Sequence, residues 1–260
     1  ASPIPLLLGF WIAVCFVPMP LFAGPGDSAE SAAVRGEHLL NAGHYREAEA
    51  ALAEAVAAAP TNGGAWMLLG RVRNYLGRYA DAATALERAV TLDAAQPGVR
   101  FELGVSLFHL DRLAEAHEHL EAHVKAHPDD ADAHWMAGQA TFRAREFDHA
   151  AGHFRRSAEL GTRYKALAPL FLGLALASVG RVEEAGAAFR AAEHAAPNGP
   201  IAVVAAAYRE RCSDPRPAAS VLRPEDYMPE STPGAGVGMY DNLVAPWEAG
   251  APSGRLVVNR

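Results

Sequence analysis

Glycines recur at a fixed spacing through the middle of the chain. From Gly36 to Gly138 they stand 34 residues apart, and Gly173 follows after 35. Three other series keep the same register, namely alanines (Ala48, Ala82, Ala116, Ala150 and Ala185), large apolar residues four positions later (Leu52, Leu86, Leu120, Phe154 and Phe189), and large apolar residues just before the alanines (Tyr45, Tyr79, Leu113, Phe147 and Val182). A period of this length predicts a protein built from stacked, similar units.

Each unit has the pattern of two helices. The first helix ends at a polar or glycine turn such as Leu76–Tyr79, and the second carries a small residue and a large one on the same face, four positions apart. Glycine and alanine allow the two helices to approach closely, and the leucine or phenylalanine fills the space between them. One pair leaves an apolar face open, so neighbouring pairs must stack.

These motifs resemble the tetratricopeptide repeat (TPR). Its W-x-x-L-G and A-x-x-x-F signals appear here as Trp66, Leu69 and Gly70 and as Ala82 and Leu86. The resemblance implies an all-α fold, a right-handed α-solenoid of about five TPR helix pairs. The units are expected at 29–62, 63–96, 97–130, 131–164 and 166–199, followed by a capping helix at 200–212, so that the solenoid spans 29–212. The extra residue near Tyr164 is expected to disturb the stacking of the last two units.

The TPR resemblance also implies where a partner binds. In this family the first helices of successive units line a concave groove that holds a peptide or helix of another protein. By register, the groove-lining residues would be Met67, Arg71, Asn74, Tyr75, Phe101, Val105, Phe108, His109, Trp135, Gln139, Phe142, Arg143, Leu170 and Leu174. Some of these side chains are equally compatible with packing between units. Phe101, Trp135, Arg71, Asn74 and Arg143 are the preferred partner contacts, because aromatic and arginine residues are common anchors.

The net charge and the absence of catalytic motifs argue against two other classes of function, nucleic-acid binding and catalysis. The net charge of -7 gives no electrostatic footprint for nucleic acid. The sequence contains no nucleophile-elbow, P-loop, zinc-protease or dinucleotide-binding motif, and we expect no enzymatic activity and no cofactor.

The first 26 residues are uncharged, and 6–17 is an unbroken apolar run. This length is typical of the hydrophobic region of a signal peptide. A retained membrane anchor is the alternative, with membrane contact through residues 4–22, which approach the ~20 apolar residues that a spanning helix needs. Prolines near both ends favour the signal peptide. Either interpretation predicts an extracytoplasmic protein, on the periplasmic side of a membrane.

Residues 213–260 form a proline- and glycine-rich tail, with seven prolines and five glycines. The tail lacks an apolar period, so we expect it to be extended. It nevertheless carries spaced apolar anchors at Tyr227, Met228, Tyr240 and Trp247. The tail is therefore either a linker or a docking arm.

Four histidines lie between His117 and Pro128, in the second helix of the third unit. His119, His123 and His127 follow one another at the four-residue spacing of a helical metal site. His123, however, replaces the alanine of the other units and is expected to point inward, while the other three histidines face solvent. We therefore predict no metal site here, and metal binding or buffering by this unit remains an alternative function. A further alternative, by analogy with other exported TPR proteins, is an assembly factor for a cytochrome or a pilus component.

Overall fold

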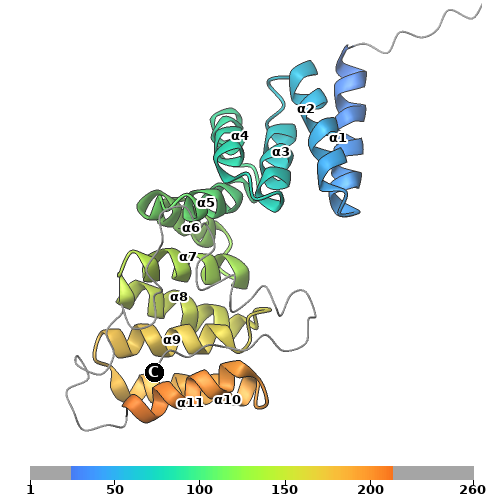
Figure 1. The fold of residues 1–260 in the computed structure, drawn as a ribbon. Coiled ribbons are helices and arrows are strands. Elements are labelled where there is room, and N and C mark those ends of the chain that lie inside the picture. Colours follow the sequence, from blue (N-terminus) through green and yellow to red (C-terminus); the bar gives the residue numbers. More distant parts are fainter. Residues whose placement is uncertain (1–24, 213–260) are drawn as a thin grey trace, which may run out of the picture.

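A computed structural model describes residues 25–212. Within this range the chain forms eleven helices and no strands (Figure 1). The helices are α1 (Pro25–Asn41), α2 (Tyr45–Ala58), α3 (Gly63–Tyr75), α4 (Tyr79–Leu92), α5 (Val99–His109), α6 (Leu113–Ala126), α7 (Ala131–Arg143), α8 (Phe147–Leu160), α9 (Leu167–Ser178), α10 (Val182–Ala195) and α11 (Pro200–Cys212). They stack in chain order from α1 at one end to α11 at the other (Figure 1). The predicted all-α solenoid of five helix pairs is confirmed.

The periodic glycines lie where the two helices of a pair approach most closely. A Cβ atom built on Gly70 of α3 would stand 2.4 Å from Cγ of Leu86 on α4. The same approach recurs between Gly104 and Leu120, at 2.5 Å. Because such distances are far below van der Waals contact, these positions require glycine. The glycine series and the leucine or phenylalanine series are therefore the two halves of one contact.

A left-handed residue ends the turn inside each pair. Gly43, Gly77 and Gly180 have φ values near +75°, and at the equivalent places Asp111 and Arg145 have φ values of 62° and 64°. The next residue caps the second helix in every pair. This turn fixes the antiparallel arrangement, with strain at the two residues that are not glycine.

The first helices of the units form the inner side of the solenoid. α1 contacts α3, α3 contacts α5, and α5 contacts α7, whereas second helices of neighbouring units make fewer contacts with one another. Elements that stand closer together lie on the concave side of a curved stack. The predicted assignment of the groove to the first helices agrees with this arrangement.

The predicted capping helix is present as α11, which packs on α10. Tyr208 of α11 stacks on Phe189 with ring centroids 5.7 Å apart, and Arg209 pairs with Glu193. The solenoid starts at Pro25, four residues before the expected boundary. The predicted N-terminal segment up to residue 24 and the tail 213–260, with its four anchors, lie outside the described residues. None of the helices that the structure describes has both the length and the apolar character needed to cross a bilayer.

Candidate functional site

The predicted groove is accessible along α3 and α5. Met67, Phe101 and Val105 are half-buried on these two helices. Tyr75 and His109, at the ends of α3 and α5, are exposed, Tyr75 to 59%. We call these five residues the groove patch. It combines apolar side chains with two rings, which is the composition of the centre of a protein-binding surface.

Two polar residues of the predicted groove tie the second unit to the third. Arg71 Nε donates to Glu102 Oε1 at 2.7 Å, across the boundary between α3 and α5. Asn74 Nδ2 donates to the Glu102 backbone oxygen at 3.0 Å, and its Oδ1 accepts from Ser106 Oγ at 2.7 Å. These half-buried bonds hold the two first helices in register beneath the groove patch. Arg71 and Asn74 are thus engaged within the chain.

The structure corrects the prediction that the groove stays open along α7 and α9. Trp135 is fully buried, and Gln139, Phe142, Leu170 and Leu174 are at most 4% exposed. The extra residue before α9 supplies one reason, because the turn that it lengthens lays Tyr164 over Trp135 with ring centroids 4.6 Å apart. Phe171 of α9 packs against Trp135 and Phe142 of the fourth unit, so these side chains form core.

Phe108 and Arg143 form a contact between the third and fourth units. Phe108 is 6% exposed, so its prediction as an open groove residue is also wrong. The Arg143 guanidinium lies over the Phe108 ring, 4.8 Å from the centroid, and Nη2 donates to Asp111 Oδ1 at 2.8 Å. Arg143 therefore serves the stacking of units, in a cation–π contact and an ion pair.

Gln139 adds a polar atom to this buried region. Its Nε2 lies buried without a hydrogen-bond partner in the structure. A buried unsatisfied donor costs about 1–3 kcal/mol, and this amide nitrogen adds that cost to the folding of the fourth unit.

The structure does not bring His119, His123 and His127 together as ligands. His123 is buried, as predicted, and its Nε2 lies 3.0 Å from Asp130 Oδ2. Partial burial, together with the neighbouring Arg100, lowers the pKa of the His119 imidazole, while His127 is exposed at the end of α6. The three histidines share a stripe on the helix, but they lie in different surroundings, beside Arg100, against Asp130 and in solvent.

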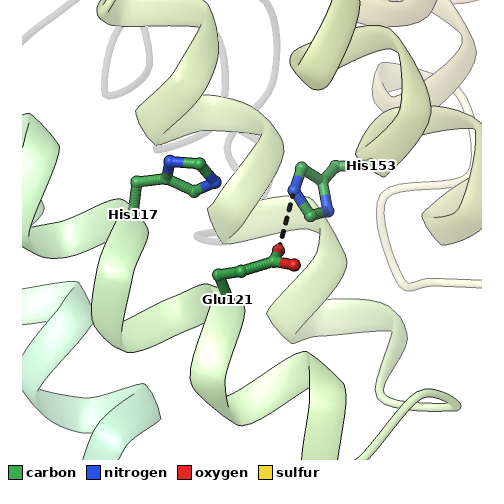
Figure 2. Close-up of side chains that lie close together, drawn as sticks. All are labelled: His117, Glu121 and His153. Atoms are coloured by element: carbon green, nitrogen blue, oxygen red, sulfur yellow. Dashed lines mark ion pairs between the residues drawn. The ribbon is translucent and has the colours of Figure 1, made fainter.

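A different set of side chains does converge, on the second helices α6 and α8 (Figure 2). One ligand atom each from His117, Glu121 and His153 lie within 4.8 Å of one another. All three side chains are partly covered, with His153 only 13% exposed. Burial lowers the pKa of His153 to about 4, so the ring is neutral at physiological pH.

Sequence reasoning missed His153 in this set because it considered one helix at a time. The 34-residue register was the available signal, because it places His153 at the position of His119 in the next unit. His117 and Glu121 lie on adjacent turns of α6 and face His153 of α8 across the boundary between the third and fourth units (Figure 2). Interactions between repeats are invisible in the pattern of a single helix.

Two family profiles match the described part of the chain. Residues 33–161 match the TPR domain of cytochrome c-type biogenesis protein H. Residues 162–200 match a tetratricopeptide-repeat profile. No curated protein sequence matches the chain.

Solved structures of similar fold are numerous. A crystal structure of MamA protein is 23% identical, with a TM-score of 0.60, over 65% of this chain and 92% of that one. YrrB, described as a TPR protein with an unusual peptide-binding site, is 20% identical with a TM-score of 0.62, over 69% and 92% of the two chains. PilF of Pseudomonas aeruginosa is 17% identical with a TM-score of 0.59, over 76% and 90%. At these identities the likeness concerns the fold. The helix pairs, the glycine contacts and the two profile matches agree, and the chain belongs to the tetratricopeptide-repeat proteins.

Proposed function

We propose that this protein is a non-catalytic scaffold whose groove patch holds a segment of another protein. The patch supports this because it leaves apolar side chains of α3 and α5 partly open on the concave side. Contiguous exposed apolar surface is costly in water and commonly marks an interaction site. The bonds from Arg71 and Asn74 to Glu102 hold the two helices rigidly, which reduces the ordering cost of binding.

We further propose that the partner is a component of cytochrome c assembly. The observation that carries this is the match of 33–161 to the TPR domain of cytochrome c-type biogenesis protein H. A c-type cytochrome before haem attachment lacks the centre of its core, so its apolar segments are exposed and suit an apolar groove. The alternative of a pilus component has less support, because the likeness to PilF extends to the fold only.

The proposed location is the periplasmic side of a membrane. The uncharged, apolar segment 1–26 and the description of the matched family favour it. Whether residues 4–22 are cleaved or anchor the protein is decided by the mass of the mature chain in the membrane fraction. A full-length mass in that fraction supports the anchor.

The test measures binding of a haem-free c-type cytochrome polypeptide to the immobilised full chain. Joint substitution of Met67→Ala and Phe101→Ala is expected to weaken binding by about 1–3 kcal/mol, because each removes an apolar anchor. Val203→Ala is the matched control, since Val203 is 71% exposed on α11, away from the groove patch. Equal binding by the double variant and the control would refute the patch, and no binding of the polypeptide to the unmodified chain would refute the partner.

A further inference from the structure

We propose that His117, Glu121 and His153 bind a late first-row divalent cation, with Zn²⁺ as the committed ion, across the boundary between the third and fourth units. The site lies on the second helices, apart from the groove patch (Figure 2). The proposal does not depend on the partner of the groove.

The three side chains have the composition and approximate spacing of a zinc site. Two imidazoles and one carboxylate form a known open zinc set, in which water completes a tetrahedron. His117 and Glu121 stand four residues apart on one face of α6, and His153 approaches from α8 (Figure 2). Ligands bonded to one tetrahedral zinc lie about 3.4 Å apart. His153 Nε2 and Glu121 Oε2 are already 3.5 Å apart, and the whole set lies within 4.8 Å. Small side-chain rotations of His117 would close the site.

A chain of hydrogen bonds fixes which nitrogen of His153 faces the site. His134 Nε2 lies 3.2 Å from the backbone oxygen of Pro128, which only accepts, so this nitrogen carries the proton. In a neutral ring His134 Nδ1 is then an acceptor, and it lies 3.3 Å from His153 Nδ1. His153 Nδ1 therefore donates, and its Nε2 is left with a bare lone pair. Metal-binding histidines are oriented in the same way, by a hydrogen bond from the other ring nitrogen.

This tautomer sets two electron-rich atoms against each other. The bare Nε2 of His153 faces the carboxylate of Glu121. A metal cation between the two atoms removes the repulsion and uses the nitrogen in its ligand form.

Further groups border the site without completing it. His149 Nδ1 lies 3.2 Å from Glu146 Oε2, and His117 Nδ1 lies 3.9 Å from the same oxygen. Glu146 thus borders His117 from the α8 side. Two imidazoles with a carboxylate favour zinc, copper or nickel over magnesium or calcium, which prefer oxygen ligands. Because the ligands come from two units, a bound ion would fix the angle between them.

The experiment titrates Zn²⁺ alone into the full-length protein after removal of metal with a chelator, followed by calorimetry and by thermal unfolding. One ion is expected to bind with a dissociation constant of about one micromolar or lower and to raise the melting temperature. His153→Gln and Glu121→Gln are each expected to weaken binding by roughly tenfold or more. The double variant His119→Gln with His127→Gln is the matched control, because it removes two other histidines of the third unit that lie outside the site. It is expected to bind within about twofold of the unmodified protein, since its ligand set is intact.

Glu121→Gln guards against a folding artefact, because its side chain is one-third exposed and nearly unchanged in shape. Its melting temperature without metal is expected to match that of the unmodified protein. Absence of tight binding would overturn the proposal. So would equal affinity in all variants, or loss of binding in the control variant with binding retained in His153→Gln and Glu121→Gln.

Discussion

Addition of a single methyl group at Gly70 tests whether the 34-residue glycine series sets the helix pairing. In Gly70→Ala the new Cβ would lie 2.4, 2.8 and 3.0 Å from Cγ, Cδ2 and Cδ1 of Leu86. Leu86 is fully buried, so its side chain has no space to move into. Overpacking of this severity costs about 3 kcal/mol, while the better helix propensity of alanine returns about 1 kcal/mol. The expected net destabilisation is about 2 kcal/mol.

A double-mutant cycle isolates the contact. Leu86→Ala alone is expected to cost about 3 kcal/mol through the cavity that it leaves. In the double variant the three nearest neighbours of the new Cβ are gone, so Gly70→Ala returns its gain of about 1 kcal/mol and the total falls to about 2 kcal/mol. The single variants sum to about 5 kcal/mol, which gives a coupling energy of about 3 kcal/mol.

The assay is urea denaturation followed by helical circular dichroism, with transition midpoint and slope compared among variants. Gly152→Ala is the matched control, because Gly152 lies on the exposed side of α8 and a Cβ there meets nothing within 4 Å. It is expected to stabilise the protein by about 0.8–1 kcal/mol. If Gly70→Ala is as stable as Gly152→Ala, or if the free-energy costs of Gly70→Ala and Leu86→Ala are additive in the double variant, the proposed contact between the two positions is refuted.

Three further changes test the turns, a helix cap and a buried imidazole. Arg145→Gly is expected to stabilise the folded protein by about 0.5–1 kcal/mol in the same assay, because it removes the backbone strain of a non-glycine residue at φ 64°. A loss of stability in this variant would contradict the prediction. Asp130 Oδ1 accepts from Ala133 N at 2.9 Å, so Asp130→Ala should cost about 1 kcal/mol at neutral pH. Although burial acts to raise the pKa of Asp130, the bonds from Ala133 and His123 hold it below its ordinary value. The stabilisation by the Asp130 carboxylate is present above the unfolded-state pKa near 4 and is lost as the pH falls through the lower folded-state pKa. The variant and the unmodified protein should therefore have the same free energy of unfolding in acid. Burial lowers the pKa of His153 to about 4, so the unfolded state binds more protons than the folded state between about pH 6.5 and 4. With chelator present, the free energy of unfolding should therefore fall as the pH drops through this range. His153→Gln should make this fall shallower, and an unchanged dependence on pH in the variant would refute the role of His153.

The 34-residue pattern was sufficient to predict the fold because the same contact between two helices occurs in every repeat. Gly70 and Leu86 stand sixteen residues apart, and the same pair recurs in every unit, so the register alone predicts two helices in close approach. The inward position of His123 followed in the same way, from the alanines at its place in other units. Residues that contact each other within a unit are close in sequence, and the same pairs recur in every unit, so sequence periodicity predicts these contacts.

The sequence by itself determined the helix pairs, their order and the cap at α11. The tertiary structure decided how much of the surface of the first helices stays open, because Tyr164 in the turn before α9 covers Trp135 and the α7 and α9 side chains close into core. It also decided which histidines meet, since His153 reaches His117 and Glu121 only across a unit boundary (Figure 2). The physical reason is the same in both cases: the angle between stacked units depends on all the side chains in the interface, and no single-unit pattern encodes it.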